Sequence, residues 1–492
     1  MAIKIIMVVV YMAVMLGIGI YNRHKANTVE NFVLGGRAIN PWMAAFSYGT
    51  AYFSGVIFVG NAGQFGWRFG ASSLWIGILG CVIFATLLPW LILGRRTRAM
   101  SRKLNSTTMA DFFGYRFDSK PLRIAVALII FVFLIPYTSS IYNGLSTLFE
   151  TCYGIPYYWC IIGVAVLTGV YVVLGGYMAS ARTDFVQGCI MIVGIFLLIG
   201  TLFHNNGGFN QTLRSLAEVE ADVPGLYASM FGPDFLSVFM ICIMVGLGGW
   251  CMPQTIHKYY VVKNERSFTI GTIVSTLFAI VVGAGCYMVG MFDHLYDSPA
   301  IYVDGAIKFD YIIPNMISTL GDGMIGLVMI LVLAASMSTL ASLVISSSST
   351  LTLDLIGQID KNMDEKKKMV WIRALVVVFV VLSAVLSVKR PLFISQLLSL
   401  AWGAIGGAFI GPFTWSLYSK KVSRASVWVS FIFGVGFVVL NLFTGIMSST
   451  NCAGFVMIMS LVLVPIVSLF TPAPDKKYVD EIFTCVETPT EE

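Results

Sequence analysis

The chain reads PWMAAFSYGTAYFSGVIFVGNAGQFGW over residues 41–67, an uncharged stretch long enough to cross a bilayer, since about 20 apolar residues suffice for a helix. It is nevertheless a poor helix, because it is interrupted by Gly49, Gly55, Gly60, Gly63 and Gly66 and by Ser47, Thr50, Tyr52, Ser54, Asn61 and Gln64. Polar backbone at membrane depth is tolerated only where protein or a water-filled cavity covers it. Two interpretations are open: a broken helix that holds a substrate and an ion, or a packing helix whose small residues admit close neighbours.

Composition places the chain in a membrane. Of its 492 residues, 57% are hydrophobic and 11% are charged, whereas charged residues make up about 25% of an ordinary soluble domain. The net charge of +6 therefore does not indicate nucleic-acid binding. The nine cysteines show no CxxC or zinc-like spacing and are interpreted as small core residues.

Hydropathy predicts thirteen membrane spans, at residues 3–21, 41–68, 71–93, 121–149, 156–175, 183–203, 235–257, 267–291, 323–352, 369–388, 391–417, 425–445 and 453–471. Lys and Arg gather in cytoplasmic loops. With the N-terminus outside, six of the 31 basic residues lie on the outer side, namely Lys4, Arg68, Arg214, Lys308, Lys389 and Arg390, and the other 25 lie on the cytoplasmic side. An odd number of spans places the C-terminus inside, with residues 472–492 as a polar cytoplasmic tail that we expect to be disordered.

A second interrupted span indicates an internal repeat. Residues 235–257 are broken by Gly246, Gly248, Gly249 and Pro253, and this span begins five spans after the first broken one. Paired interrupted segments in corresponding places point to the site of an inverted-repeat transporter. The chain is thus predicted to be one transporter domain, with a peripheral first helix at 3–21, repeats at 41–203 and 235–417, and two additional helices within 425–471.

Two further features could handle an ion. Ala335, Ser338, Thr339 and Ser342 lie at i, i+3, i+4 and i+7 and form one face of a helix. Their oxygens suit a hard cation such as Na+, although small-residue packing and hydroxyl bonds to the same helix explain such a stripe as well. Asp184 lies at the cytoplasmic start of the sixth span, where it either handles an ion or forms a structural pair with Arg182.

The sequence does not predict an enzyme. It contains no HExxH, GxSxG or Walker-type GxxxxGK motif. Its four histidines are scattered over different loops and span ends.

Five motifs in order resemble the sodium:solute symporter family, most closely its sodium/proline and sodium/pantothenate branches. They are NFVLGGR (31–37), GTAYFSG (49–55), the block Gly175, Gly176, Asp184 and Gln187, AASMSTL (334–340) and LAWGAIGGAFIGP (400–412). The resemblance implies an all-α LeuT-type fold of two inverted five-helix repeats, with thirteen helices in all. It also implies a multi-pass protein of the plasma membrane.

The resemblance implies a sodium site made by the carbonyls of Thr50, Phe53 and Ala335 and the hydroxyls of Ser338 and Thr339. Some members bind a second sodium through the counterpart of Asp184 and two serines. Here one serine is replaced by Ala341 and the other is retained as Ser342. One sodium per solute is therefore expected. The glycines between Gly49 and Gly60 are predicted to form the hinge of the site.

The solute is expected beside that ion, against Tyr52, Ser54, Gly55, Tyr137, Ser140, Gly249, Trp250, Gln254, Trp402 and Gly406. The sequence departs from the proline pattern, since Tyr52 replaces an acidic residue, and Val245 and Gly249 replace a Trp and a Tyr. No Arg or Lys is expected in the pocket. The predicted function is sodium symport of a small polar solute, an amino acid or a small carboxylate, by a protein that works as a monomer in the lipid bilayer. The alternatives are a sodium-independent or proton-coupled transporter, or a solute-binding sensor or channel.

Overall fold

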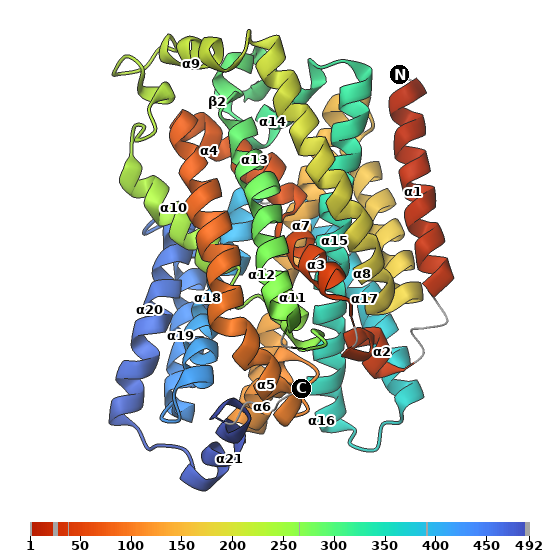
Figure 1. Ribbon diagram of the computed structural model, residues 1–492, viewed down its shortest axis with the longest axis vertical. Helices are drawn as coiled ribbons and strands as arrows, with labels where there is room; N and C mark the ends of the chain where they lie inside the picture. Colours follow the sequence, from red (N-terminus) through yellow and green to blue (C-terminus); the bar gives the residue numbers. More distant parts are fainter. Residues whose placement is uncertain (1, 23–27, 38, 265, 390–391, 488–492) are drawn as a thin grey trace.

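The computed structural model describes residues 2–22, 28–37, 39–264, 266–389 and 392–487. Most of its long helices run along the long axis of one bundle (Figure 1). The helices are α1 Ala2–Asn22, α2 Val29–Leu34, α3 Pro41–Tyr52, α4 Ala62–Phe69, α5 Arg95–Lys103, α6 Met109–Arg116, α7 Lys120–Tyr153, α8 Tyr157–Asn205, α9 Phe209–Ala217, α10 Phe235–Gly248, α11 Pro253–Tyr260, α12 Arg266–Phe278, α13 Ala284–Gly290, α14 Ile312–Ser318, α15 Asp322–Thr350, α16 Gly357–Ile359, α17 Glu365–Val388, α18 Ile394–Tyr418, α19 Arg424–Thr444, α20 Ser449–Phe470 and α21 Lys476–Glu487. Further helical segments are η2 Gly35–Arg37, η3 Val56–Asn61, η4 Gly70–Ser73, η5 Ile76–Leu87, η6 Trp90–Gly94, η7 Leu226–Ala228, η8 Ala279–Gly283, η9 Asp293–Tyr296, η10 Pro299–Ile301, η11 Phe309–Tyr311 and η12 Leu351–Ile356, and the strands β1 Tyr302–Val303 and β2 Ala306–Ile307 pair antiparallel.

Ten helices of the described part are long and apolar enough to cross a membrane, or up to twelve when two bent pairs each count as one span. The bent pairs are Pro41–Tyr52 with Val56–Ser73 and Phe235–Gly248 with Pro253–Tyr260, each bent by 46°. These pairs coincide with the two interrupted spans of the sequence. Both predicted breaks are therefore present, and the packing-only interpretation of residues 41–67 is insufficient.

The first break results from local hydrogen bonding. Pro41 opens α3, and the side chain of Asn40 accepts a hydrogen bond from the Trp42 N–H at 3.0 Å, which caps the helix. The helix ends at Phe53, whose backbone is extended at φ −83° and ψ 99°. Ser54 then starts the next helical segment, since its side chain accepts from the Val56 N–H at 3.3 Å. The carbonyls of the last turn of α3 are thereby released from the helix.

The glycines around this break are packing positions in this conformation, and their role as the hinge of the site stays a prediction. A Cβ at Gly49 would lie 2.5 Å from the ring of Phe278, and one at Gly60 would lie 2.6 Å from Ile394. Neither glycine has a positive φ, so neither needs the conformational freedom of glycine. The break itself lies at Phe53, in a conformation that any residue adopts, and the glycines allow α12 and α18 to approach it closely.

The second break separates α10 from α11. Pro253 opens α11 at a position where its missing N–H costs nothing. Thr255 bridges the gap, because its hydroxyl donates to the carbonyls of Gly249 and Met252, both at 2.8 Å. The short helix α11 packs against α3 and α15, so the two broken spans meet in the middle of the fold.

The predicted spans at 156–175 and 183–203 belong to one helical stretch. α8 has 49 residues and would extend roughly 70 Å at 1.5 Å per residue, more than twice the hydrocarbon thickness of a bilayer. It is interrupted at Gly176, which has φ 54° and ψ −156°. A Cβ there would also lie 2.8 Å from the ring of Phe32. Glycine is required at this position by both its backbone and its neighbour.

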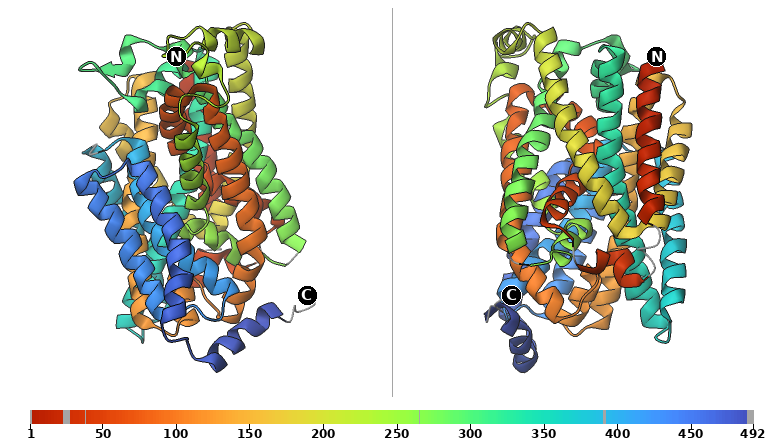
Figure 2. Two further views of the ribbon diagram at one scale, coloured as in Figure 1. Left: turned by 90° about the vertical axis from the view of Figure 1, so that its left-hand side faces the viewer. Right: turned by 45° about the vertical axis from the view of Figure 1, so that its right-hand side comes forward.

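Helix α1 and the pair α19 and α20 lie at opposite edges of the bundle. α1 forms one edge, and α19 and α20 form the other, where they pack on α18 (Figures 1 and 2). The N-terminus lies at the same end as α9, and the C-terminus lies at the opposite end with α5 (Figure 1). α5 carries Arg95, Arg96, Arg98, Arg102 and Lys103, so the chain ends on the basic side of the molecule.

The C-terminal tail is helical, which corrects the expectation of disorder. α21 buries Val479, Ile482 and Phe483 and packs against α5. Lys420 holds it with ion pairs of 2.9 Å to Asp480 and 2.7 Å to Glu487. The amphipathic pattern of apolar residues within the acidic tail indicates this helix in the sequence. Residues 488–492 lie outside the described part.

Candidate ion and substrate site

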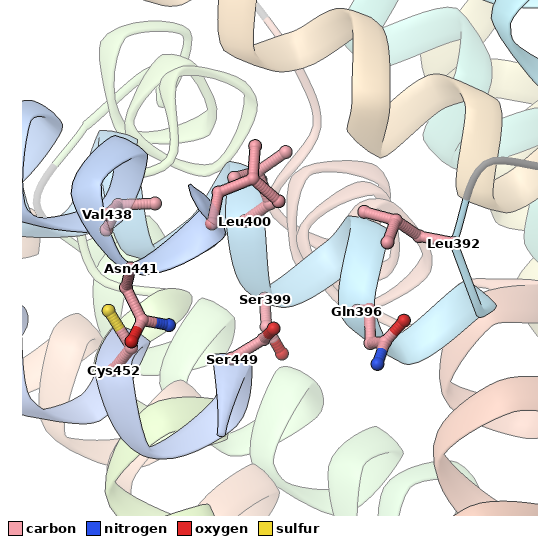
Figure 3. A pocket seen from close by; sticks show the side chains of 9 residues that line it. Leu392, Gln396, Ser399, Leu400, Val438, Asn441, Ser449 and Cys452 are labelled. Atoms are coloured by element: carbon pink, nitrogen blue, oxygen red, sulfur yellow. The ribbon is translucent and has the colours of Figure 1, made fainter. Parts of the chain in front are cut away.

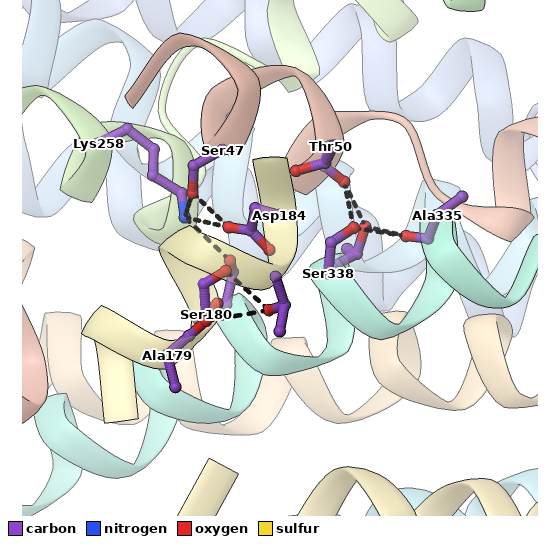
Figure 4. Close-up of polar contacts among 11 residues, drawn as sticks. Ser47, Thr50, Ala179, Ser180, Asp184, Lys258, Ala335 and Ser338 are labelled. Atoms are coloured by element: carbon purple, nitrogen blue, oxygen red, sulfur yellow. Dashed lines mark hydrogen bonds and ion pairs between the residues drawn. The ribbon is translucent and has the colours of Figure 1, made fainter. Parts of the chain in front are cut away.

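Four oxygen atoms of the predicted sodium site converge between α3 and α15. The Ser338 hydroxyl lies 2.9 Å from the Thr50 carbonyl and 3.0 Å from the Ala335 carbonyl. The Thr339 hydroxyl lies 3.1 Å and 3.0 Å from the same two carbonyls. All four residues are buried. Figure 4 shows the break of the first span facing the hydroxyl stripe of α15.

The donor set suits a sodium ion. Two carbonyls and two hydroxyls offer neutral oxygens, which a hard monovalent cation accepts without the charge of a carboxylate. The Thr50 side-chain hydroxyl adds a further buried oxygen that has no hydrogen-bond partner within the described residues. Phe53 stands at the end of α3 with extended backbone, and its part in coordination stays a prediction.

A lysine occupies the place expected for a second sodium. The Lys258 ammonium lies 2.7 Å from the Ser47 hydroxyl, 3.1 Å from the Ser342 hydroxyl and 3.7 Å from Oδ2 of Asp184 (Figure 4). Ser47 also donates a hydrogen bond to Asp184. The structure thus pairs Asp184 with Lys258.

Sequence reasoning missed Lys258. The residue lies in the HKYY segment after Pro253 and was counted with the basic residues of the cytoplasmic side. The structure buries it completely, at 0% exposure. The sequence did contain an indication of this burial. Lys258 follows Pro253 closely, in the helix that restarts the second broken span, so its side chain can reach the centre of the bundle.

Three aromatic rings form the centre of the predicted substrate site. The Tyr52 ring lies 5.7 Å from that of Trp402, and the Tyr137 ring lies 5.8 Å from Trp402 at 87°. Tyr52 also donates a hydrogen bond from its hydroxyl to the Val245 carbonyl at 2.6 Å, which joins the two broken spans. Gly249 faces the ring of Tyr52, 2.8 Å from where a Cβ would be. These rings are buried, so the conformation described is closed to solvent at this point.

Three other predicted substrate residues, Ser140, Trp250 and Gly406, face other partners. Ser140 donates to the Tyr137 carbonyl of its own helix at 2.6 Å, and the Trp250 indole donates to the Phe84 carbonyl at 2.6 Å. Gly406 faces Met457 of α20, 2.7 Å from where a Cβ would be. We therefore place Gly406 outside the pocket.

Ser54 and Gly55 lie at the first helix break, and the contact of Gln254 with the solute stays a prediction. Ser54 caps the segment after the break. A Cβ at Gly55 would lie 2.4 Å from the Ser336 hydroxyl of α15. Gln254 is buried, and its Oε1 has no hydrogen-bond partner within the described part of the chain.

A separate pocket lies between α18, α19 and α20 (Figure 3). It is lined by Leu392, Gln396, Ser399, Leu400, Val438, Asn441, Leu442, Ser449 and Cys452 and has a volume of about 10 Å³. That volume admits about one water molecule. The pocket is therefore too small for a metabolite.

A buried ion cluster lies at the end of the bundle that contains α5 and α6. Arg123 of α7 lies 2.5 Å from Oδ1 of Asp111 and 2.6 Å from Oδ1 of Asp354. Thr108 donates to the other oxygen of Asp354 at 2.5 Å. The cluster joins α6, α7 and η12 through buried charges.

A family model for the sodium:solute symporter family matches residues 32–434. The chain belongs to the sodium:solute symporter family. It is a multi-pass membrane transporter and not an enzyme, and membership implies sodium as its coupling ion. The symporter is 30% identical to the osmoregulated proline transporter OpuE of Bacillus subtilis over 95% of this chain and 94% of that protein. It is 26% identical to the sodium/pantothenate symporter of Haemophilus influenzae over 89% of this chain and 90% of that one.

Among solved structures, the symporter resembles a Na+-coupled sialic acid symporter in a substrate-bound, outward-open state. The TM-score is 0.80 at 19% identity, covering 96% of this chain and 99% of the other. Mhp1, a nucleobase-cation-symport transporter, is similar with a TM-score of 0.52 at 13% identity over 93% and 98% of the two chains. These likenesses show the fold.

Substitution of Gly249 by alanine should impair the symporter. The added methyl would press on the Tyr52 ring, which Trp402 holds on another side, and overpacking of this kind costs about 1–3 kcal/mol. We expect the initial rate of solute uptake to fall at least about tenfold, which corresponds to about 1.4 kcal/mol. Gly436→Ala on α19 is the matched control, because a Cβ there meets nothing within 4 Å. Equal uptake by the two variants would contradict the role given to the Tyr52 ring.

Proposed function

We propose that this symporter couples the inward movement of one sodium ion to the uptake of a small polar organic solute by alternating access. The observation that carries the proposal is the convergence of the Thr50 and Ala335 carbonyls with the Ser338 and Thr339 hydroxyls. Tyr52, the last residue of α3, brings the ring cluster next to the same break. Ion and solute would therefore share one broken helix, which allows each to affect the affinity for the other.

The same proposal includes the membrane topology. Dividing α8 at Gly176 adds a thirteenth span to the twelve counted when each bent pair is one span. The basic helix α5 lies at the end where the chain terminates (Figure 1), which supports an outer N-terminus and a cytoplasmic C-terminus. The equal bends of the two broken pairs support inverted repeats at 41–203 and 235–417 in a LeuT-type fold, and we propose that a monomer is the working unit.

We propose an amino acid or another small carboxylate as the solute. OpuE is a proline transporter, and the Haemophilus influenzae relative is a pantothenate symporter. The Trp402 indole N–H in the ring cluster and Gln254 Oε1 on α11 are buried without hydrogen-bond partners among the described residues, and buried polar groups normally have partners. A buried donor in the ring cluster and a buried acceptor on α11, at the second helix break, suit a compact solute with a polar end and an apolar body.

The coupling would be energetically adequate. Moving one positive charge inward across about 100 mV releases about 2.3 kcal/mol, and a tenfold sodium gradient releases about 1.4 kcal/mol. For a neutral solute the two together would sustain a concentration ratio of several hundredfold. Accumulation at that level requires strict coupling of the two movements.

Uptake into proteoliposomes tests the proposal. A labelled panel of proline, other small amino acids, pantothenate and short monocarboxylates would be offered with an inward sodium gradient, an inward proton gradient or no gradient. We expect accumulation of one class only under the sodium gradient, increased by an inside-negative potential. Accumulation under the proton gradient alone, equilibration without a gradient, or solute binding without uptake would each refute sodium symport.

A further inference from the structure

Lys258 is embedded in oxygen atoms from three other elements. Its ammonium contacts Ser47 of α3, Ser342 of α15 and Asp184 of α8, and it lies 4.8 Å from the centre of the Tyr177 ring. Lys258, Ser47 and Asp184 are each 0% exposed. The charge of the ammonium is balanced by one carboxylate inside the bundle.

The residues do not fit a second sodium while this lysine is present. The resemblance assigns that ion to Asp184 and Ser342, and the Lys258 ammonium is already bound to both. A sodium ion beside it would place two positive charges against one carboxylate in a medium of low polarity, where like charges repel strongly. Ala341 also removes one of the hydroxyls expected there.

More oxygen atoms surround the Lys258 ammonium than it contacts. Lys258 and Ser47 both contact Oδ2 of Asp184, which leaves Oδ1 free of both, and the Ser180 hydroxyl lies at the same buried carboxylate. With the ammonium removed, Oδ1 and the Ser180 hydroxyl would join Ser47, Ser342 and Oδ2 of Asp184 as potential ligands for a small cation.

We propose that the Lys258 ammonium is a tethered cation that takes the place of a second coupling ion. A diffusible ion would bind and leave in each transport cycle, whereas the ammonium stays in the protein and contributes no charge to transport. It also attaches α11 of the second broken span to α3 of the first through Ser47. The inference rests on the proposed sodium symport, and it accounts for coupling to one sodium in a fold that can hold more.

The sodium dependence of Lys258→Met tests this inference. Methionine keeps an unbranched apolar stem of similar length and removes the charge, which leaves the Asp184 carboxylate free to bind sodium. In wild type we expect solute uptake to depend on sodium with a Hill coefficient near 1, and in Lys258→Met with a coefficient approaching 2. A second measurement is the stabilisation of the detergent-solubilised protein by NaCl relative to choline chloride, which should depend more steeply on sodium concentration in the variant.

The double variant Lys258→Met/Asp184→Asn is the matched control. It removes both charges together, so it should fold and return to a Hill coefficient near 1 and to the wild-type sodium dependence of stability. If Lys258→Met can be purified only in sodium, that requirement is itself the expected result.

Two outcomes would overturn the tethered cation. One is a Lys258→Met variant whose uptake and stability depend on sodium as in wild type. The other is a Lys258→Met variant that fails to fold in sodium and choline alike while the double variant folds, because Asp184 would then not recruit sodium. Wild-type protein that shows no sodium dependence would instead refute the proposed symport, so the two failures are distinguishable.

Discussion

Substituting Ser338 or Thr339 by alanine should weaken the apparent affinity for sodium by about ten- to a hundredfold. Each hydroxyl approaches both carbonyls of the site within 3.1 Å, so each is in position to bind an ion held between them. An interaction of a polar group with a full charge contributes about 1.5–3 kcal/mol, which corresponds to that range. The measurement is the sodium concentration that gives half-maximal solute uptake in proteoliposomes.

Folding should survive these substitutions, because the remaining hydroxyl still donates to both carbonyls. Ser348→Ala is the matched control, since Ser348 lies on the same buried helix and donates to the Val344 and Ile345 carbonyls one turn earlier. It should leave sodium affinity unchanged. Wild-type sodium dependence in both Ser338→Ala and Thr339→Ala would remove these hydroxyls from the ion site.

Substituting Arg123 by methionine should destabilise the protein by about 3–5 kcal/mol, because it leaves two buried carboxylates without their cation. Asp111 is 6% exposed and Asp354 is 0% exposed, so water cannot replace the guanidinium. The measurement is thermal or denaturant unfolding of the purified protein in detergent.

Two variants make the Arg123 result specific. Lys420→Met removes an exposed cation that pairs with Asp480 and Glu487, and surface pairs contribute only about 0–1 kcal/mol. Arg123→Met/Asp354→Asn removes one of the unpaired charges and should recover part of the lost stability. A loss no greater than that of Lys420→Met would show that the cluster does not hold α6, α7 and η12 together.

The sequence predicted a structural feature best where the residues of that one segment decide the feature. The helix break at residues 53–55 was visible as polar residues within an apolar span, and the break at residues 249–252 as glycines followed by Pro253. It was least successful where a side chain depends on a distant element. Lys258 resembles any basic residue at a span end until α3, α8 and α15 are placed around it.

The sequence by itself determined that the chain crosses the membrane many times, that two spans are interrupted, and that a hydroxyl face on residues 335–342 could meet an interruption. Hydropathy and helical periodicity are local properties, so they can be recognised from the sequence without knowledge of the fold. Tertiary structure alone decided that the glycines near Phe53 serve packing, that Tyr52 joins Val245 across the two broken spans, and that Lys258 neutralises Asp184. These outcomes depend on which oxygen or ring a side chain meets after helices far apart in the sequence pack together, and that is a property of the packed bundle.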